Sequence, residues 1–123
     1  MGSIVHIEIT ANDLARANKF YEEALGWKME DSGMPGTEYW LTNSEGDGIE
    51  GAIMPKTYRE QPTIATVGVT DIDETIEKVK QAGGEIINEI HDIPGVGKHV
   101  YIKDTEGNVV GLLQPNEGST IRK

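Results

Sequence analysis

The sequence contains no cysteine, which excludes disulfide bonds, thiolate metal ligands and cysteine nucleophiles. It also lacks any apolar run approaching the roughly 20 residues that a membrane-spanning helix needs. The first residues show no basic region followed by an apolar core, the pattern of a secretory signal. We therefore expect a cytoplasmic protein with no transmembrane helix.

Basic residues are scarce as well. The 123 residues include 11 Lys and Arg against 21 Asp and Glu, which gives a net charge of −10. Such a charge repels phosphate backbones and anionic lipid surfaces, so binding to nucleic acid or to a membrane is disfavoured. An acidic, solvated surface accounts for this charge. The net charge does not indicate whether the protein binds a small-molecule ligand.

The N-terminal stretch predicts a strand with one polar and one apolar face. Alternation places His6 and Glu8, with Ile4 and Thr10, on the polar face. An imidazole, a carboxylate and a hydroxyl on one face are typical of the lining of a wet cavity. The apolar side chains of the other face suit packing against a helix, and they are Val5, Ile7 and Ile9.

An amphipathic helix is predicted directly after this strand. Asn12 or Asp13 is placed to cap its first turn, and Gly26 is placed to end it in the left-handed conformation. Its apolar residues recur at steps of three and four and form one stripe. They are Leu14, Ala17, Phe20, Tyr21, Ala24 and Leu25.

The pattern of strand, helix and three strands occurs twice. The first module, about residues 4–54, continues with predicted strands at Trp27–Asp31, Thr37–Asn43 and Ile49–Met54. Residues 55–62 have no periodicity and predict a linker, and the second module covers about residues 63–115. Its strands are expected at Thr63–Thr70, Glu85–Ile90, Lys98–Lys103 and Val109–Gln114, its helix behind a cap at Asp71 or Asp73, and a loop at His91–Gly97. One such sheet leaves a face unburied, so two modules must pair, with a ligand expected in the cleft between them.

This order resembles the vicinal oxygen chelate superfamily, which includes glyoxalase I, bleomycin-resistance proteins and extradiol dioxygenases. The resemblance is carried by HIEITANDLARANKFYEEALGWKME near the start and DTEGNVVGLLQP near the end, and it extends from Ile4 to Pro115. It implies an α+β fold of two tandem βαβββ modules that form an incomplete barrel, usually in a homodimer. In metal-dependent members, the first, fourth, fifth and eighth strands each present one inward-facing metal ligand.

The same resemblance assigns these four positions in this chain. His6 takes the first and Glu50 the position on the fourth strand, whereas Thr66 and Gly111 stand where glyoxalase I has its second His and second Glu. Neither Thr66 nor Gly111 supplies the missing ligand. Two protein ligands with water rarely hold a divalent transition metal tightly. We therefore expect no metal and no other cofactor.

Further candidates have simpler explanations. His91 in the expected loop and His99 at the start of a strand are predicted to be surface or hydrogen-bonded histidines, although both could in principle substitute as ligands. Trp27, Tyr39 and Trp40 either pack in the core, the commoner fate of such residues, or pave an aromatic ligand surface.

The function that this pattern suggests is binding of a small organic molecule, with His6, Glu8, Glu50, Thr66 and Gly111 lining the pocket. If the protein is catalytic, a lyase or isomerase acting beside a carbonyl is expected. Glu50 or Glu8 then removes a proton, and His6 orients or polarises the substrate oxygen. The alternatives are a non-catalytic drug-sequestering protein of the bleomycin-resistance type and a regulatory domain with a vestigial cavity. Fold analogy does not choose between them.

Overall fold

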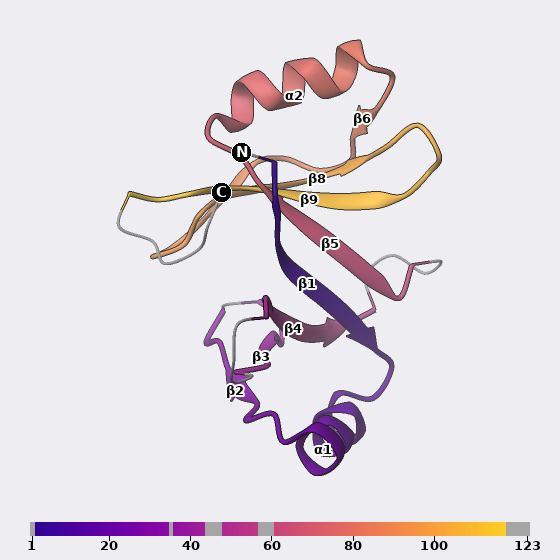
Figure 1. Cartoon of the computed structure of the whole chain (residues 1–123), viewed down its shortest axis with the longest axis vertical. Coiled ribbons are helices and arrows are strands. Elements are labelled where there is room, and N and C mark those ends of the chain that lie inside the picture. Colours follow the sequence, from indigo (N-terminus) through magenta and orange to yellow (C-terminus); the bar gives the residue numbers. More distant parts are fainter. Residues whose placement is uncertain (1, 35, 44–47, 57–60, 118–123) are drawn as a thin grey trace. The chain divides into compact units, whose positions relative to one another are not determined.

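The chain divides into two compact units in the computed structural model, which describes residues 2–34, 36–43, 48–56 and 61–117. The N-terminal unit is His6–Thr63, and the C-terminal unit combines Met1–Val5 with Ile64–Lys123. Strand β1 (Ile4–Ala11) and strand β5 (Thr63–Gly68) each belong in part to both units. Figure 1 shows the order of the elements along the chain.

Parallel pairing of the first and last strands organises the N-terminal unit. Strand β1 pairs with β4 (Glu50–Pro55), and this register places His6 opposite Glu50. The two short strands β2 (Glu30–Asp31) and β3 (Trp40–Leu41) complete the order β2-β3-β4-β1 with antiparallel pairings. The structure confirms these strands, although β2 and β3 are shorter than the sequence predicts.

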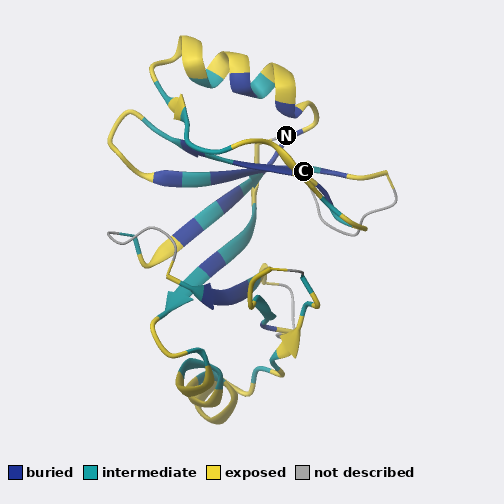
Figure 2. Ribbon diagram, turned by 180° about the vertical axis from the view of Figure 1, so that it is seen from behind, coloured by how far each residue is buried: buried dark blue, intermediate teal, exposed yellow. Residues whose placement is uncertain are grey.

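Helix α1 (Leu14–Leu25) has the caps that the sequence predicts. The side chain of Asp13 accepts a hydrogen bond from the Arg16 amide at 3.0 Å. Gly26 ends the helix with φ of 74°, and its amide donates to the Glu22 carbonyl. The helix buries none of its residues, however, and Phe20 is 58% exposed. Figure 2 shows α1 without any fully buried residue, so the predicted apolar stripe is present but not enclosed.

The C-terminal unit also pairs its first and last strands in parallel, and its last two strands form a long hairpin. Strand β5 pairs in parallel with β9 (Val109–Pro115), which pairs along its whole length with antiparallel β8 (Gly97–Lys103). The short strands β6 (Glu85–Ile86) and β7 (His91–Ile93) both pair with β8.

Helix α2 (Ile72–Gln81) covers one face of this sheet and forms the core of the unit. Asp71 caps the helix by accepting from the Glu74 amide, and Gln114 of β9 accepts from the Ile72 amide at 2.8 Å. Burying one aliphatic side chain contributes about 1.5–3 kcal/mol. Figure 2 shows the buried stripe of α2 facing buried β8 and β9. The core residues are Val69, Ile72, Ile76, Val100, Ile102 and Leu112.

The segment His91–Gly97 is a hairpin, so the predicted loop there was wrong. Residues 91–93 pair with 97–99, and only the turn between them lacks partners in the sheet. Its Pro and Gly residues did predict a turn, but the flanking residues extend the ladder on both sides. The pairing needs glycine at position 97, because the Cβ of any other residue there would clash with the Gln114 carbonyl of β9. Among the described residues, the second module thus has one more strand than the first.

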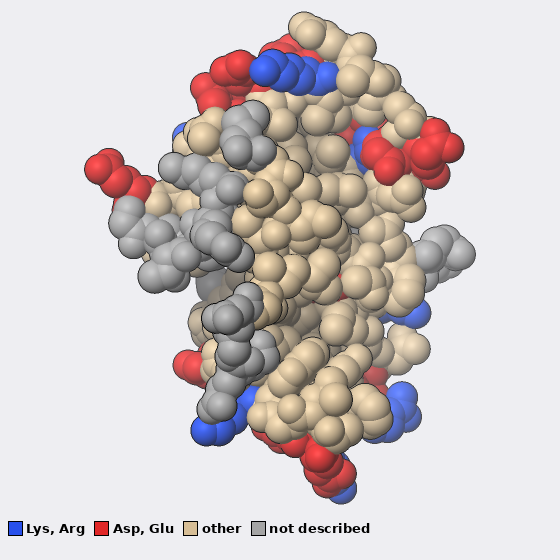
Figure 3. Space-filling view, viewed as in Figure 1, with Lys and Arg blue, Asp and Glu red and all other residues tan. Residues whose placement is uncertain are grey.

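Charged side chains of both signs lie on the outer surface of α2, as Figure 3 shows. Lys78 pairs with Glu74 at 3.2 Å, and Lys80 pairs with Glu77 at 3.8 Å. Such exposed pairs contribute about 0.3–0.5 kcal/mol each, so they keep the surface solvated rather than hold the fold. Neither helix of the described chain is long and apolar enough to cross a membrane.

Candidate functional site

A chain of hydrogen bonds links three side chains in the N-terminal unit. The hydroxyl of Tyr39 lies 2.8 Å from His6 Nε2 and donates to Glu8 Oε2 at 2.7 Å. His6 and Glu8 come from the polar face of β1, whereas Tyr39 directly precedes β3. The His6 and Tyr39 rings are also nearly parallel, with an angle of 15° between them and centroids 6.2 Å apart.

With Glu8 as an ionised acceptor, the hydrogen bonds of Tyr39 assign the tautomer of His6. Tyr39 has a single hydroxyl proton, and it is donated to Glu8. His6 Nε2 must therefore carry a proton and donate it to the Tyr39 oxygen. The lone pair of the neutral ring is then on Nδ1, which makes His6 a proton acceptor at that atom.

Burial favours the neutral form of this imidazole. It lowers the pKa of His6 below its usual value, and the Glu50 carboxylate raises that pKa by a smaller amount. Glu8 is only 4% exposed. A buried carboxylate requires hydrogen-bond donors, and the Tyr39 hydroxyl supplies one of them.

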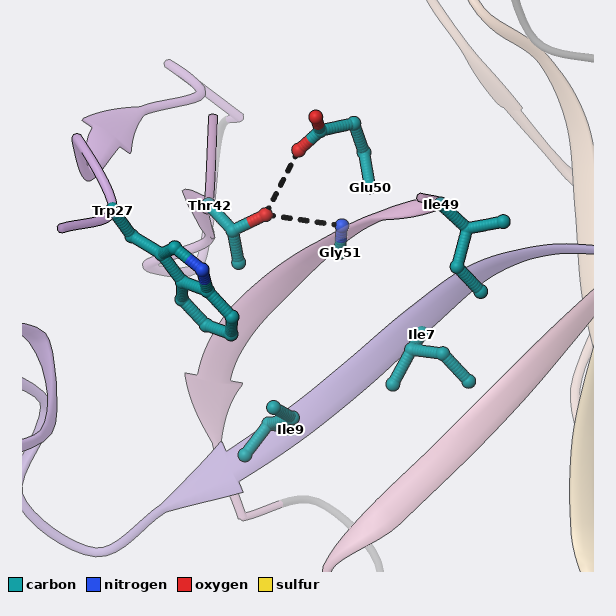
Figure 4. A pocket seen from close by; sticks show the side chains of 7 residues that line it. All are labelled: Ile7, Ile9, Trp27, Thr42, Ile49, Glu50 and Gly51. Carbon is teal, nitrogen blue, oxygen red and sulfur yellow. Dashed lines mark hydrogen bonds between the residues drawn. The ribbon is translucent and has the colours of Figure 1, made fainter. Parts of the chain in front are cut away.

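Glu50 is fixed at the start of β4 by a second set of hydrogen bonds. Thr42 Oγ1 donates to Glu50 Oε2 at 3.0 Å and accepts from the Gly51 amide at 3.2 Å. Thr42 is buried, whereas Glu50 is exposed. In Figure 4 the Glu50 side chain points away from Ile7 and Ile9. Its carboxylate is thus held by a buried hydroxyl while it faces away from the apolar side of β1.

A small apolar cavity of about 90 Å³ lies on that other side of β1. Typical ligand pockets measure about 300–1,000 Å³, so this cavity alone holds no more than a small group. Figure 4 shows the indole of Trp27 and the two isoleucines of β1 around it. The lining residues are Ile7, Ile9, Trp27, Thr42, Ile49, Glu50 and Gly51.

The donor set of the N-terminal unit does not fit a transition-metal site. His6 and Glu50 are neighbours in the β1–β4 register, but His6 Nε2 is engaged by Tyr39. In the described parts of the chain, no three His, Asp or Glu side chains come together in a way that could hold a metal ion. An isolated transition-metal site usually needs three or four protein ligands.

The other two predicted site residues face each other in the C-terminal unit. Thr66 of β5 and Gly111 of β9 are register partners. His99 of β8 joins them, because a Cβ on Gly111 would lie 2.9 Å from both His99 Nε2 and Thr66 Oγ1. His99 is only 6% exposed, so of the two predicted alternatives the surface histidine is wrong for this residue, and the hydrogen-bonded histidine stays a prediction.

The structure thus places the predicted site residues in two groups. His6, Glu8 and Glu50 belong to the N-terminal unit, and Thr66 and Gly111 belong to the C-terminal unit. That one ligand contacts both groups stays a prediction. The sequence reasoning did not assign Tyr39, Thr42 or His99 to a polar site. For His99 a signal existed, because it alternates with Tyr101 along a strand that runs beside the predicted site residue Gly111.

Comparison with known proteins identifies the family. The model of the Glyoxalase/Bleomycin resistance protein/Dioxygenase superfamily matches residues 3–112. A Vibrio parahaemolyticus protein that carries the name probable lactoylglutathione lyase is 30% identical, over 96% of this chain and 94% of its own. A Mycobacterium tuberculosis protein named as a glyoxylase is 31% identical over 94% of this chain. The match covers 47% of that mycobacterial protein, so this chain spans about half its length.

Solved structures agree with this result at the level of the fold. Methylmalonyl-CoA epimerase from Mycobacterium tuberculosis has a TM-score of 0.68 and 18% sequence identity, covering 93% of this chain and 91% of its own. The chain therefore belongs to the Glyoxalase/Bleomycin resistance protein/Dioxygenase superfamily, and it has the α+β fold of that superfamily.

Proposed function

We propose that this protein binds a small organic carbonyl compound and acts on it as a metal-independent lyase or isomerase of the glyoxalase-like type. The observation that carries this proposal is the position of the Tyr39 hydroxyl between His6 and Glu8. A neutral imidazole with a hydrogen-bonded partner on one nitrogen and a lone pair on the other is suited to general-base catalysis.

In the proposed reaction, His6 Nδ1 takes a proton from the carbon next to the carbonyl. The electron pair of that C–H bond moves to form an enolate, and return of the proton to a neighbouring position gives the isomer. The imidazolium that forms donates through Nε2 to Tyr39, whose hydroxyl donates to Glu8. The carboxylate thereby stabilises the positive charge that develops on His6.

These roles differ from those that the sequence suggests. Glu8 is buried and accepts from Tyr39, so it acts through the chain rather than as the base. His6 is a proton acceptor at Nδ1 rather than a donor that polarises the substrate oxygen. Glu50 stays a candidate second base, because its exposed carboxylate is held by Thr42.

The experiment is proton exchange with solvent, which requires no knowledge of the final product. Protein treated with EDTA is incubated in D₂O with a panel of small aldehydes, ketones and 2-oxo acids, and loss of the C–H signal is followed by NMR. We expect exchange with at least one compound, loss of exchange in His6→Ala, and slower exchange in Tyr39→Phe with a changed pH profile. Removing one general base or its partner typically costs about 10²–10⁴-fold in rate.

The matched control is Tyr21→Phe. Tyr21 contributes its ring to a stack with Trp27, which phenylalanine retains. Thermal-shift screening with the same panel distinguishes the sequestering alternative. Binding without exchange would favour sequestration. If no compound of the panel were bound and none showed exchange, the proposal would be overturned.

A further inference from the structure

The cavity of about 90 Å³ in the N-terminal unit lies on the apolar face of β1. Ile7 and Ile9 line it, whereas His6 and Glu8 alternate with them and belong to the opposite face of the strand. Ile53, the register partner of Ile9 in β4, is fully buried, but Ile7 and Ile9 are only half-buried. The described chain therefore leaves this part of the apolar face incompletely covered.

The walls of the cavity are in place without an occupant. The indole of Trp27 forms the wall across from β1 (Figure 4), and it stacks on the ring of Tyr21 with centroids 4.7 Å apart and 11° between the planes. Ile49, which directly precedes β4, lines the cavity and is 39% exposed. Gly51, the register partner of Ile7, contributes no side chain. A site that is already formed costs little ordering when it binds a ligand.

Polar groups in the lining are engaged within the protein. The Thr42 hydroxyl donates to Glu50 and accepts from the Gly51 amide. The Glu50 side chain points away from Ile7 and Ile9 (Figure 4). A charged or strongly polar molecule would lose its hydration in this cavity without gaining partners there. The walls therefore favour an apolar occupant.

The volume limits the size of that occupant. A cavity of about 150 Å³ lined by aliphatic and aromatic side chains binds benzene, so about 90 Å³ has room for about four carbon atoms. We propose that the N-terminal unit binds the branched alkyl group of a small uncharged molecule in this cavity. The site lies on the face of β1 opposite to His6 and Glu8, so the proposal does not depend on the proposed reaction.

The test uses the whole chain with ¹³C-labelled isoleucine methyl groups, and 2-methylpropane dissolved in the buffer is the probe. We expect the probe to shift the methyl signals of Ile7, Ile9 and Ile49. The signals of Ile72 and Ile102, which belong to the core of the C-terminal unit, should stay unchanged. Acetamide has the same number of heavy atoms but is polar, and it should shift the first three signals several-fold less at equal concentration.

The decisive variant is Ile49→Ala, which removes most of one wall. It should weaken binding of 2-methylpropane several-fold. Ile90→Ala is the matched control, because Ile90 is 38% exposed, belongs to the C-terminal unit and does not line the cavity. This control should bind the probe as the wild type does.

Four results would overturn the proposal. Signals of Ile7 and Ile9 that do not move with 2-methylpropane would show that the cavity binds no alkyl group. If acetamide shifted them equally, the argument from the apolar walls would be wrong. Wild-type affinity in Ile49→Ala would show that the probe binds elsewhere. Signals that respond to protein concentration and not to the probe would show that a second copy of the chain covers the cavity.

Discussion

The hydroxyl of Tyr39 joins the imidazole of His6 to the carboxylate of Glu8, with hydrogen bonds of 2.8 Å and 2.7 Å. The two residues of β1 are separated by one position, whereas Tyr39 is 33 positions from His6 and 31 from Glu8. The link therefore fixes a distant segment onto the polar face of β1. It also gives the two ring nitrogens of His6 different roles.

Tyr39→Phe should destabilise the protein by about 1–3 kcal/mol, because it removes a donor from a buried carboxylate. Urea unfolding followed by circular dichroism measures this change. The double variant Tyr39→Phe with Glu8→Gln should lose less than the sum of the single variants, since the two changes remove one interaction. Additive losses would show that the hydroxyl and the carboxylate do not interact in solution.

Stability should fall as the pH is lowered from neutral, in part because of His6. Burial lowers the pKa of folded His6 below the value of about 6.5 that it has in the unfolded chain. The unfolded chain therefore takes up a proton first, so the free energy of unfolding decreases as pH falls through about 6.5. The part of the unfolding free energy that depends on His6 is fully present above a pH of about 6.5. It is lost as the pH falls from there to the lower pKa of His6 in the folded state.

His6→Gln removes this contribution and should flatten the dependence of unfolding free energy on pH below neutral. His91→Gln is the matched control, because His91 is exposed. Equal slopes for the wild type and His6→Gln would mean that the pKa of His6 does not differ between the folded and unfolded states.

The sequence predicts local features of this molecule well and long-range contacts poorly. Alternation alone places His6 and Glu8 on one face of β1, and the caps at Asp13 and Gly26 follow from local chemistry. Local rules act over a few residues, so they do not reveal which distant hydroxyl reaches His6. That depends on the path of the segment before β3.

The same limit explains the C-terminal unit. The motif around Pro94 predicts a turn, but it does not show that the residues on both sides of the turn pair, and the pairing of His91 with His99 makes the expected loop a hairpin. The burial of His99 follows from this hairpin and from Gly111 on the neighbouring strand. Register, rather than residue type, brings His99 close to Gly111.

Protein purified without added metal should contain no stoichiometric zinc, nickel or iron. The physical reason is the donor set, because the family resemblance places Thr66 and Gly111, which are not metal ligands, at two of the four ligand positions. Elemental analysis should find well below one ion per chain, and glutathione-dependent conversion of methylglyoxal should be negligible with or without EDTA. About one metal per chain, lost in His6→Ala, would contradict this prediction.

We also predict a homodimer. The N-terminal unit leaves large apolar side chains accessible, with Phe20 58%, Leu25 57% and Ile49 39% exposed. Large apolar side chains left accessible in this way favour association. Sedimentation equilibrium should give about twice the chain mass of 13.4 kDa, and Phe20→Glu with Leu25→Glu should shift the protein towards the monomer. A concentration-independent mass of 13.4 kDa in the wild type would rule the dimer out.

Two glycines inside strands should respond differently to alanine, because different atoms lie in the way. A Cβ on Gly51 would lie 2.5 Å from the backbone carbonyl oxygen of Ile7, within the β1–β4 pairing. Backbone held in a sheet moves only if the ladder opens. Overpacking typically destabilises a protein by about 1–3 kcal/mol, and Gly51→Ala should reach at least the upper end of this range. At Gly111 the obstacles are the ends of two side chains, which can rotate away. Gly111→Ala should therefore cost only about 1 kcal/mol.

Gly48→Ala is the reference for this pair, since a Cβ there meets nothing within 4 Å. It should change the free energy of unfolding by less than about 0.5 kcal/mol, as surface substitutions usually do. Hydrogen exchange adds a structural measurement, because Gly51→Ala should reduce protection of the β1 and β4 amides while leaving β8 and β9 unchanged. If Gly111→Ala proves as costly as Gly51→Ala, then His99 and Thr66 are held as firmly as backbone.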